Sequence, residues 1–127
     1  MSKIQIGKQE IIHFIGIGGI GMSGLAQIMK TMGFNVQGSD INENKNTDNC
    51  KKLGIKILKG HSTKNISNAT IVVKSSAIKK NNTELSYSKK RKIPSYDRVE
   101  MLANIIDLKK NIIITGSHGK TTTTSLV

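Results

Sequence analysis

The sequence has almost nothing that would cross-link the chain or carry it into a membrane. Cys50 is the only cysteine, so an intrachain disulfide framework is excluded and a reducing compartment fits. No stretch approaches the roughly 20 consecutive apolar residues of a transmembrane helix, and no secretory signal precedes the first apolar run. We therefore expect a cytoplasmic protein without a membrane partner. The hydrophobic content of 36% over 127 residues suits a packed domain.

Acidic residues are also scarce, since 8 Asp and Glu stand against 20 Lys and Arg and give a net charge of +12. Nucleic-acid binding is one interpretation, because cationic patches neutralise phosphates. However, the cations are nearly all lysine and are spread along the chain, and the densest run, residues 89–92, has no interleaved aromatic residue. We expect no nucleic-acid partner, only a field that attracts anionic nucleotides.

Glycine, in contrast, is concentrated after the first apolar run. Residues 11–24 read IIHFIGIGGIGMSG, which predicts a strand, a tight turn and the start of a helix. Such a turn lets the backbone approach a pyrophosphate, and the helix N–H groups then point at its charge. Asp40 lies 19 positions after Gly21, at the end of the next predicted strand. It could accept hydrogen bonds from a ribose, or it could only cap a turn.

Short β-rich runs alternate with helical patterns along the chain. We expect strands at residues 11–17, 35–38, 55–58, 69–73, 93–96 and 112–115, and helices at 21–32, before Gly54, at 82–91 and at 98–108. This alternation predicts an α/β fold, a Rossmann-like parallel sheet with helices on both faces. We expect a flexible tail at residues 1–10, the sheet domain at 11–108, and the start of a second, ATP-binding domain at 109–127.

A second glycine turn follows the last predicted strand. Residues 116–121 read GSHGKT and resemble a shortened P-loop, whose backbone N–H groups cradle phosphates. In such a loop Lys120 would reach the β and γ oxygens and the Thr121 hydroxyl would bind Mg²⁺. The full pattern has a glycine where Ile114 stands. A surface turn with a solvated lysine is the alternative.

Two phosphate-binding turns in this order, about 100 residues apart, resemble the Mur ligases of bacterial cell-wall synthesis. The resemblance rests on IHFIGIGGIGMSGLA (12–26), GSD (38–40), SSAI (75–78), RVEMLA (98–103) and GSHGKTTTT (116–124). It implies a three-domain, ATP-dependent and ADP-forming ligase of peptidoglycan synthesis, which makes an amide bond through an acyl phosphate. The chain would hold the first domain and the opening of the second, and we expect no ligase activity from it alone.

The resemblance also implies the substrates and the site residues. The substrates would be UDP-N-acetylmuramate, L-alanine and ATP, with Mg²⁺ as cofactor. The residues facing the UDP-sugar would be Gly16, Gly18, Gly19, Ile20, Gly21, Met22, Ser39, Asp40, His61, Ser75, Ser76 and Arg98. The residues facing ATP would be Gly116, Ser117, His118, Gly119, Lys120, Thr121 and Thr122. Lys120 and Thr121 would be catalytic, with Thr121 on the metal.

Several alternatives stay open. His61 could be a solvated turn residue, His118 could serve loop packing, and His13 is expected to be a core histidine. The related ligase that recycles murein tripeptide shares the layout of motifs. A NAD-binding Rossmann domain would explain residues 16–40 but would leave the second glycine turn without a role. The sequence does not determine the oligomeric state.

Overall fold

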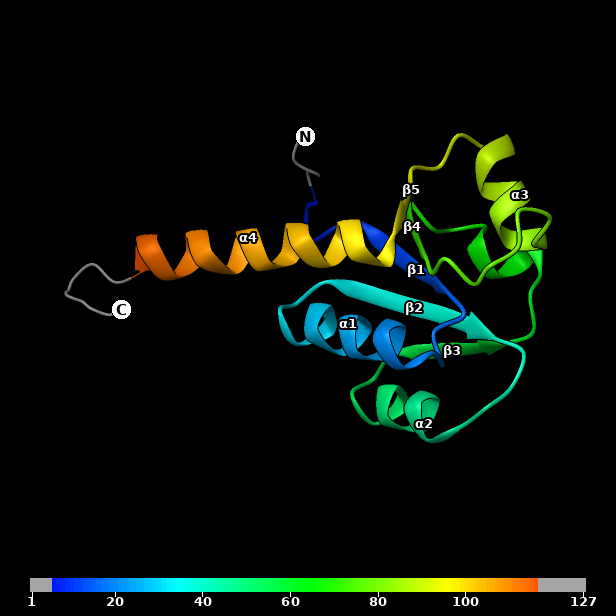
Figure 1. Ribbon diagram of the computed structural model, residues 1–127, viewed down its shortest axis with the longest axis horizontal. Coiled ribbons are helices and arrows are strands. Elements are labelled where there is room, and N and C mark those ends of the chain that lie inside the picture. The colour runs from blue at the N-terminus through cyan, green and yellow to red at the C-terminus, as the bar shows by residue number, and fades with distance from the viewer. Residues whose placement is uncertain (1–5, 117–127) are drawn as a thin grey trace.

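The computed structural model describes residues 6–116, with side chains for residues 6–108. Strands and helices alternate along these residues (Figure 1). In chain order they are β1 (Ile11–Ile15), α1 (Ile20–Thr31), β2 (Asn35–Asp40), α2 (Lys45–Lys52), β3 (Lys56–Lys59), the 3₁₀ helix η1 (Thr63–Ile66), β4 (Ile71–Lys74), α3 (Thr83–Lys90), β5 (Ser95–Asp97) and α4 (Arg98–Gly116). The sequence pattern predicted all of these but η1 within a few residues of their ends, up to Leu108 of α4.

The sheet is parallel throughout and its strand order is β3-β2-β1-β4-β5. The central strand β1 pairs with β2 on one side and with β4 on the other. The chain therefore moves outward to β3, returns to the middle, and moves outward again to β5. This arrangement confirms the predicted Rossmann-like α/β fold. It also puts a topological switch point between β1 and β4, where such sheets bind ligands beyond the carboxyl ends of their strands.

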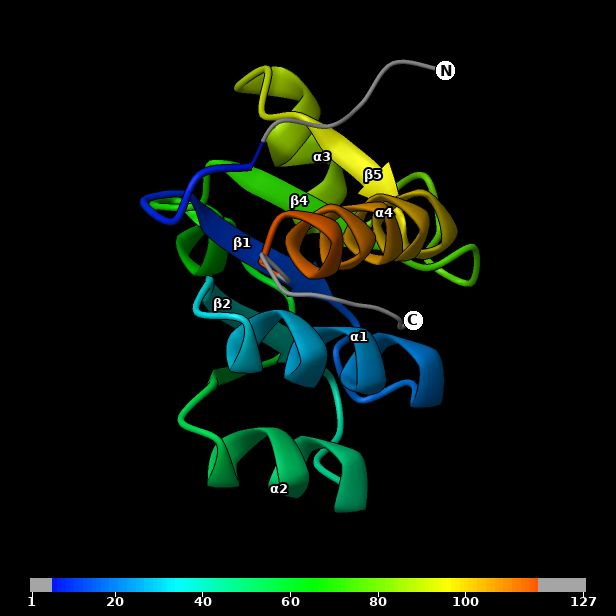
Figure 2. The same ribbon diagram turned by 90° about the vertical axis from the view of Figure 1, so that its left-hand side faces the viewer.

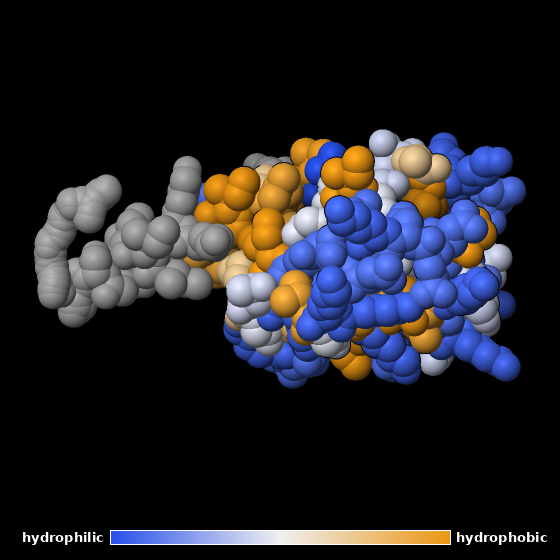
Figure 3. Space-filling model, turned by 90° about the horizontal axis from the view of Figure 1, so that it is seen from below, coloured by the Kyte–Doolittle hydropathy of each residue, from blue (hydrophilic) through white to orange (hydrophobic). Residues whose placement is uncertain are grey.

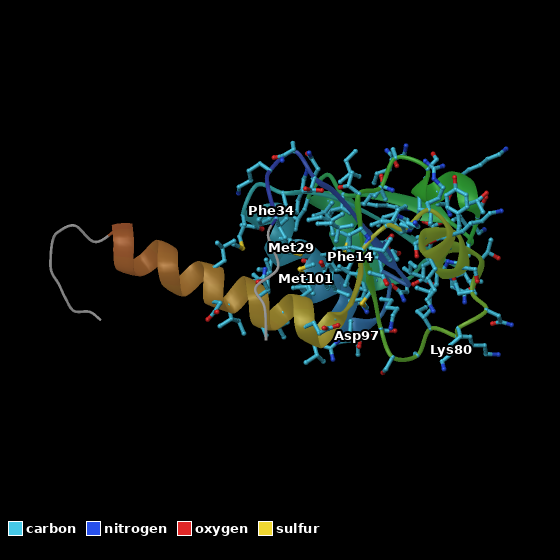
Figure 4. The ribbon with its side chains drawn as sticks, turned by 90° about the horizontal axis from the view of Figure 1, so that it is seen from above. Phe14, Met29, Phe34, Lys80, Asp97 and Met101 are labelled. Atoms are coloured by element: carbon cyan, nitrogen blue, oxygen red, sulfur yellow. The ribbon has the colours of Figure 1, made fainter. Side chains whose placement is uncertain are left out.

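The larger apolar core lies between the sheet and α1, α2 and α4, which Figure 2 shows on one side of the sheet. Ile12 and Phe14 lie two positions apart in β1, so they share one face of the strand, and both belong to this core. Figure 4 labels Phe14, Met29 of α1 and Met101 of α4, whose buried side chains belong to the same cluster. Burial of each such side chain stabilises the fold by about 1.5–3 kcal/mol. The core thus ties the strand before the glycine turn to both helices beside it.

The opposite face of the sheet is covered by α3 and η1, which contact each other. Its apolar cluster is small and consists of Ile15, Val72 and Leu85, with Ile78 and Ile93 packed against it. The buried polar side chains of His13, Gln37, Ser39 and Glu84 contact one another on this face. They belong to the site described below.

The packed part of the chain begins before Ile11. Ile6 packs against the larger core. The Lys8 ammonium lies 4.4 Å from the centroid of the Phe34 ring and donates a hydrogen bond to the Met32 carbonyl at the end of α1. A cation suits this position, because the carbonyls at a helix C-terminus carry partial negative charge.

The predicted strand at residues 112–115 is wrong for the structure described, because α4 continues through them to Gly116. A short apolar run is compatible with either a strand or a helix, and its neighbours decide between them. Within residues 6–116 no strand pairs with this segment, and a lone strand would leave its backbone groups unpaired. A helix continuing from Arg98 satisfies those groups internally.

The surface is uneven in polarity. Seen from below, hydrophilic residues cover the face around α2, and hydrophobic residues gather toward α4 (Figure 3). Among the described residues, no helix is both long and apolar enough to span a bilayer.

Candidate functional site at the carboxyl edge of the sheet

The glycine turn between β1 and α1 leaves the first N–H groups of α1 facing outward. Gly16 has φ of +79°, a conformation that favours glycine. Gly19 is the N-cap and carries no side chain that could cap the helix. The amides of Ile20, Gly21 and Met22 are therefore the orphan donors of this helix end, with the positive end of its dipole behind them. This is the geometry predicted for a diphosphate.

The end of β2 braces this turn. The Ser39 carbonyl accepts hydrogen bonds from Gly16 N at 2.8 Å and Ile17 N at 3.0 Å. The Asp40 carboxylate accepts from Gly18 N at 2.7 Å and from Asn42 N at 3.2 Å. Asp40 thus caps the glycine turn, the alternative that the sequence left beside ribose binding. Because the Gly18 amide already donates to Asp40, the amides of Ile20 to Met22 are the donors of this turn that a ligand could use.

Two further segments reach the turn from the other half of the sheet. The loop after β4, which contains Ser75 and Ser76, brings Ile78 against Gly16, where an added Cβ would lie 3.3 Å from Ile78 Cδ1. Arg98, the first residue of α4, lies over Gly21, and a Cβ there would be 2.9 Å from its Cδ, Nε and Cζ atoms. The structure therefore brings the predicted Arg98 to the start of α1.

His61 reaches the same edge through the loop after β3. Gly60 N donates to the Asp40 carbonyl at 2.7 Å, which ties this loop to β2. The His61 Nδ1 atom lies 3.2 Å from Ser39 Oγ, and its side chain is 14% exposed. His61 is therefore packed into the edge of the site, which differs from the alternative of a solvated turn residue.

A buried carboxylate, Glu84 of α3, lies behind His61. The side chain is fully buried and accepts hydrogen bonds from His13 Nε2 at 2.7 Å and from Ser39 Oγ at 2.6 Å. Burial raises the pKa of Glu84, and hydrogen bonds from His13, Ser39 and Asn65 outweigh it, so that the pKa is lowered to about 2. Glu84 is therefore ionised at neutral pH.

The prediction that His13 is a core histidine is confirmed, since its side chain is fully buried. Sequence reasoning missed its partners Glu84 and Gln37, and also Asn65, which contacts both of those residues. A signal did exist: His13 in β1 and Gln37 and Ser39 in β2 are polar at alternating positions, and parallel pairing puts them on one face. Buried polar groups need partners, so this face requires a polar cover.

The predicted ATP and metal residues 117–122 lie outside the described residues, and Gly116 is the last residue of α4. A separate hollow of about 230 Å³ lies at the opposite, amino edge of the sheet. It is lined by Ile11, Asn35, Val36, Gln37, Gly54, Lys56 and Asn68. None of the predicted site residues lines it.

Comparison with known proteins decides which family carries this site. The family described as "Mur ligase family, catalytic domain" matches residues 11–110. The chain belongs to the Mur ligase family. The UDP-N-acetylmuramate–L-alanine ligase of Pelagibacter ubique (strain HTCC1062) is 66% identical over 125 residues, which are 98% of this chain and 27% of that protein.

More distant members agree. The enzyme of the same name from Aquifex aeolicus (strain VF5) is 56% identical over 91% of this chain and 25% of its own length. The crystal structure of the Thermotoga maritima UDP-N-acetylmuramate-alanine ligase superposes with a TM-score of 0.75 at 35% identity, over 79% of this chain and 23% of that one. The chain thus spans about a quarter of the length of the curated Mur ligases it matches.

Proposed function

We propose that this chain is the UDP-sugar-binding part of a ligase that joins L-alanine to UDP-N-acetylmuramate. The observation that carries the proposal is the position of Arg98 over Gly21 at the start of α1, in the space that a side chain at residue 21 would fill. It combines a helix N-terminus with a guanidinium, the two features that best hold a diphosphate. The 66% identity to a UDP-N-acetylmuramate–L-alanine ligase supports this substrate.

The groups at the carboxyl edge would contact different parts of the UDP-sugar. The amides of Ile20 to Met22 bind diphosphate oxygens, and Arg98, which lies over Gly21, adds positive charge. Ile20, which is 86% exposed, offers an apolar surface beside them. His61 and Ser39 lie on the β2–β3 side, where the uridine end would sit, and Ser75 and Ser76 lie beyond β4.

For the complete enzyme we propose ATP as the second nucleotide and Mg²⁺ as its cofactor. The support is the sequence GSHGKTT at residues 116–122. Lys120 would stabilise charge on the transferring phosphoryl group and Thr121 would hold the metal. An acyl phosphate on the muramyl carboxylate would then be attacked by the L-alanine amine. We also propose that the enzyme acts in the cytoplasm, in peptidoglycan synthesis.

A murein-peptide ligase is the second candidate. The Neisseria meningitidis ligase whose name gives UDP-N-acetylmuramate and L-alanyl-γ-D-glutamyl-meso-diaminopimelate superposes with a TM-score of 0.66 at 28% identity, over 70% of this chain and 28% of that one. Both candidates share the UDP-sugar. The choice between them therefore rests on the higher identity to the L-alanine ligases.

Calorimetric titration of the chain with UDP-N-acetylmuramate tests the proposal, with NADH as the competing ligand. We expect saturable binding of the UDP-sugar and none of NADH. Arg98→Ala should weaken that binding about tenfold to a hundredfold, because a charge-assisted hydrogen bond contributes about 1.5–3 kcal/mol. Arg91→Ala is the matched control, because Arg91 follows the C-terminal end of α3 and pairs with Tyr87 there. Binding of NADH alone, or of neither ligand, would contradict the proposal.

A further inference from the structure

A fully buried carboxylate needs a reason, because taking a charge out of water is costly unless every lone pair is satisfied. Glu84 meets that condition. Its Oε1 atom accepts from His13 Nε2 and Ser39 Oγ. Its Oε2 atom accepts from Ser62 N at 3.0 Å and Asn65 Nδ2 at 2.6 Å, with His61 Nδ1 3.4 Å away. Every group around this carboxylate is a donor.

The contacts of Glu84 fix the proton on His13. Gln37 Nε2 donates to the Asn65 carbonyl at 2.8 Å, which pins the amide orientation, and it lies 2.9 Å from His13 Nδ1. The Nδ1 atom of His13 must therefore accept, so the proton is on Nε2 and points at Glu84.

The same reasoning gives the opposite tautomer for His61. The Ser39 hydroxyl hydrogen is used toward Glu84 Oε1, so Ser39 Oγ can only accept from His61. The Glu84 Oε2 atom is also an acceptor. The proton of neutral His61 is therefore on Nδ1, and Nε2 is left with a lone pair. Of the two ring nitrogens of His61, Nδ1 has hydrogen-bonding neighbours among the described residues and Nε2 has none there.

We propose that Glu84 is a positioning residue for the nucleotide-sugar site: it holds His61 as the Nδ1–H tautomer, so that Nε2 accepts a hydrogen bond from the ligand. The ligand group would be an N–H or O–H donor, such as a nucleobase imide or a sugar hydroxyl. Glu84 also accepts a hydrogen bond from the Ser39 side chain. The backbone carbonyl of the same residue accepts hydrogen bonds from Gly16 N and Ile17 N. One carboxylate on α3 thus contacts both the end of β2, at Ser39, and the loop after β3, at His61. The inference rests on the proposed function for the identity of the ligand only.

The first test needs no ligand. In ¹⁵N-labelled chain, the side-chain nitrogen shifts of each histidine report its tautomer, with assignment by single His→Ala variants. We expect His13 as Nε2–H and His61 as Nδ1–H. His61 found as Nε2–H in the wild type would overturn the proposal.

The second test replaces the carboxylate with an amide of the same size. In Glu84→Gln the amide nitrogen faces donors on either side. If it faces His61, or if Ser39 turns its hydroxyl toward His61, the His61 Nδ1 atom must become an acceptor. We therefore expect Glu84→Gln to shift His61 toward Nε2–H and to weaken UDP-N-acetylmuramate binding about tenfold. An unchanged tautomer, or a shifted tautomer with an unchanged Kd, would overturn the proposal.

Two control variants separate positioning from folding. Leu85→Val disturbs the apolar packing of the same helix and should lower the melting temperature without changing the tautomers or the Kd. Ser39→Ala leaves Glu84 as an acceptor for His61, so His61 should stay Nδ1–H. A switch of tautomer in Ser39→Ala would assign the role to Ser39 instead, and this variant decides the question if Glu84→Gln does not fold.

Binding by the double variants completes the test. In a His61→Ala background, Glu84→Gln should lose most of its effect on the Kd, because residues that act through one another are not additive. Full additivity would overturn the proposal. If wild-type chain did not bind UDP-N-acetylmuramate at all, the proposed function would fail, and the tautomers would still show whether Glu84 positions His61.

Discussion

Among single residues, Gly21 is one at which a substitution should change ligand affinity without lowering the stability of the fold. It lies in the first turn of α1 and its missing side chain leaves room for the Arg98 guanidinium. Alanine there would displace Arg98 but would favour the helix by up to about 1 kcal/mol. We expect Gly21→Ala to weaken UDP-N-acetylmuramate binding about tenfold without lowering the free energy of unfolding, as measured by calorimetry and urea denaturation.

Gly24→Ala is the matched control for that variant. Gly24 lies one turn further along α1, and an added Cβ would have no atom within 4 Å. Its helix gains the same propensity, while the site is untouched. Equal affinities for the Gly21→Ala and Gly24→Ala chains would show that Arg98 is not needed at the glycine turn.

The residues of the site differ in how well the sequence predicted them. The glycines were found because their spacing after an apolar run is typical of phosphate-binding turns. Arg98 was found from the resemblance of residues 98–103 to the Mur ligases. Glu84 was not, because an acidic residue two positions after Asn82 is what the exposed first turn of a helix usually contains. The pairing of β1 with β2 aligns His13 with Gln37 and shows that this face needs a polar cover, but the hydrogen bonds of the folded chain are what identify Glu84 as that cover.

At the scale of elements, α3 depends on its N-cap. The Asn82 side chain accepts hydrogen bonds from Glu84 N at 2.9 Å and Leu85 N at 3.2 Å. Asn82→Ala should lower the free energy of unfolding by about 1 kcal/mol, and Asn82→Asp should retain it, because a carboxylate also caps. Urea denaturation of the two variants provides the measurement, and equal losses in both would argue against capping as the cause.

The elements that the sequence predicted correctly are those with a strong local signal. Strands β1 and β4 are apolar runs, and α1 has its apolar residues on one face, so local pattern and packing agree. The 3₁₀ helix η1 has no such period and depends on contacts with α3. Residues 112–115 were assigned to a strand because they are apolar, yet strand formation depends on a neighbour that the local sequence does not specify.

At the scale of the whole molecule, the buried charge makes stability depend on acid. The pKa of Glu84 is about 2 in the folded chain against a usual 4.5. A lowered pKa stabilises the fold above pH 4.5, and this contribution is lost as the pH falls toward 2. We expect about 3 kcal/mol to be lost between about pH 5 and pH 2, measured by urea denaturation across that range.

Glu84→Gln is the control for this dependence. The variant has no ionisable group at this position, so the difference in unfolding free energy between it and the wild type should shrink as the pH falls. A difference that stays constant from pH 5 to pH 2 would mean that Glu84 does not carry the effect.

Backbone amide shifts on titration with UDP-N-acetylmuramate show whether this ligand binds at the carboxyl edge of the sheet. We predict saturable shifts at residues 16–22, 39–40, 61, 75–76 and 98. Shifts confined to the amino edge, around Ile11, Asn35, Lys56 and Asn68, would contradict binding at the carboxyl edge, and so would no shifts at all.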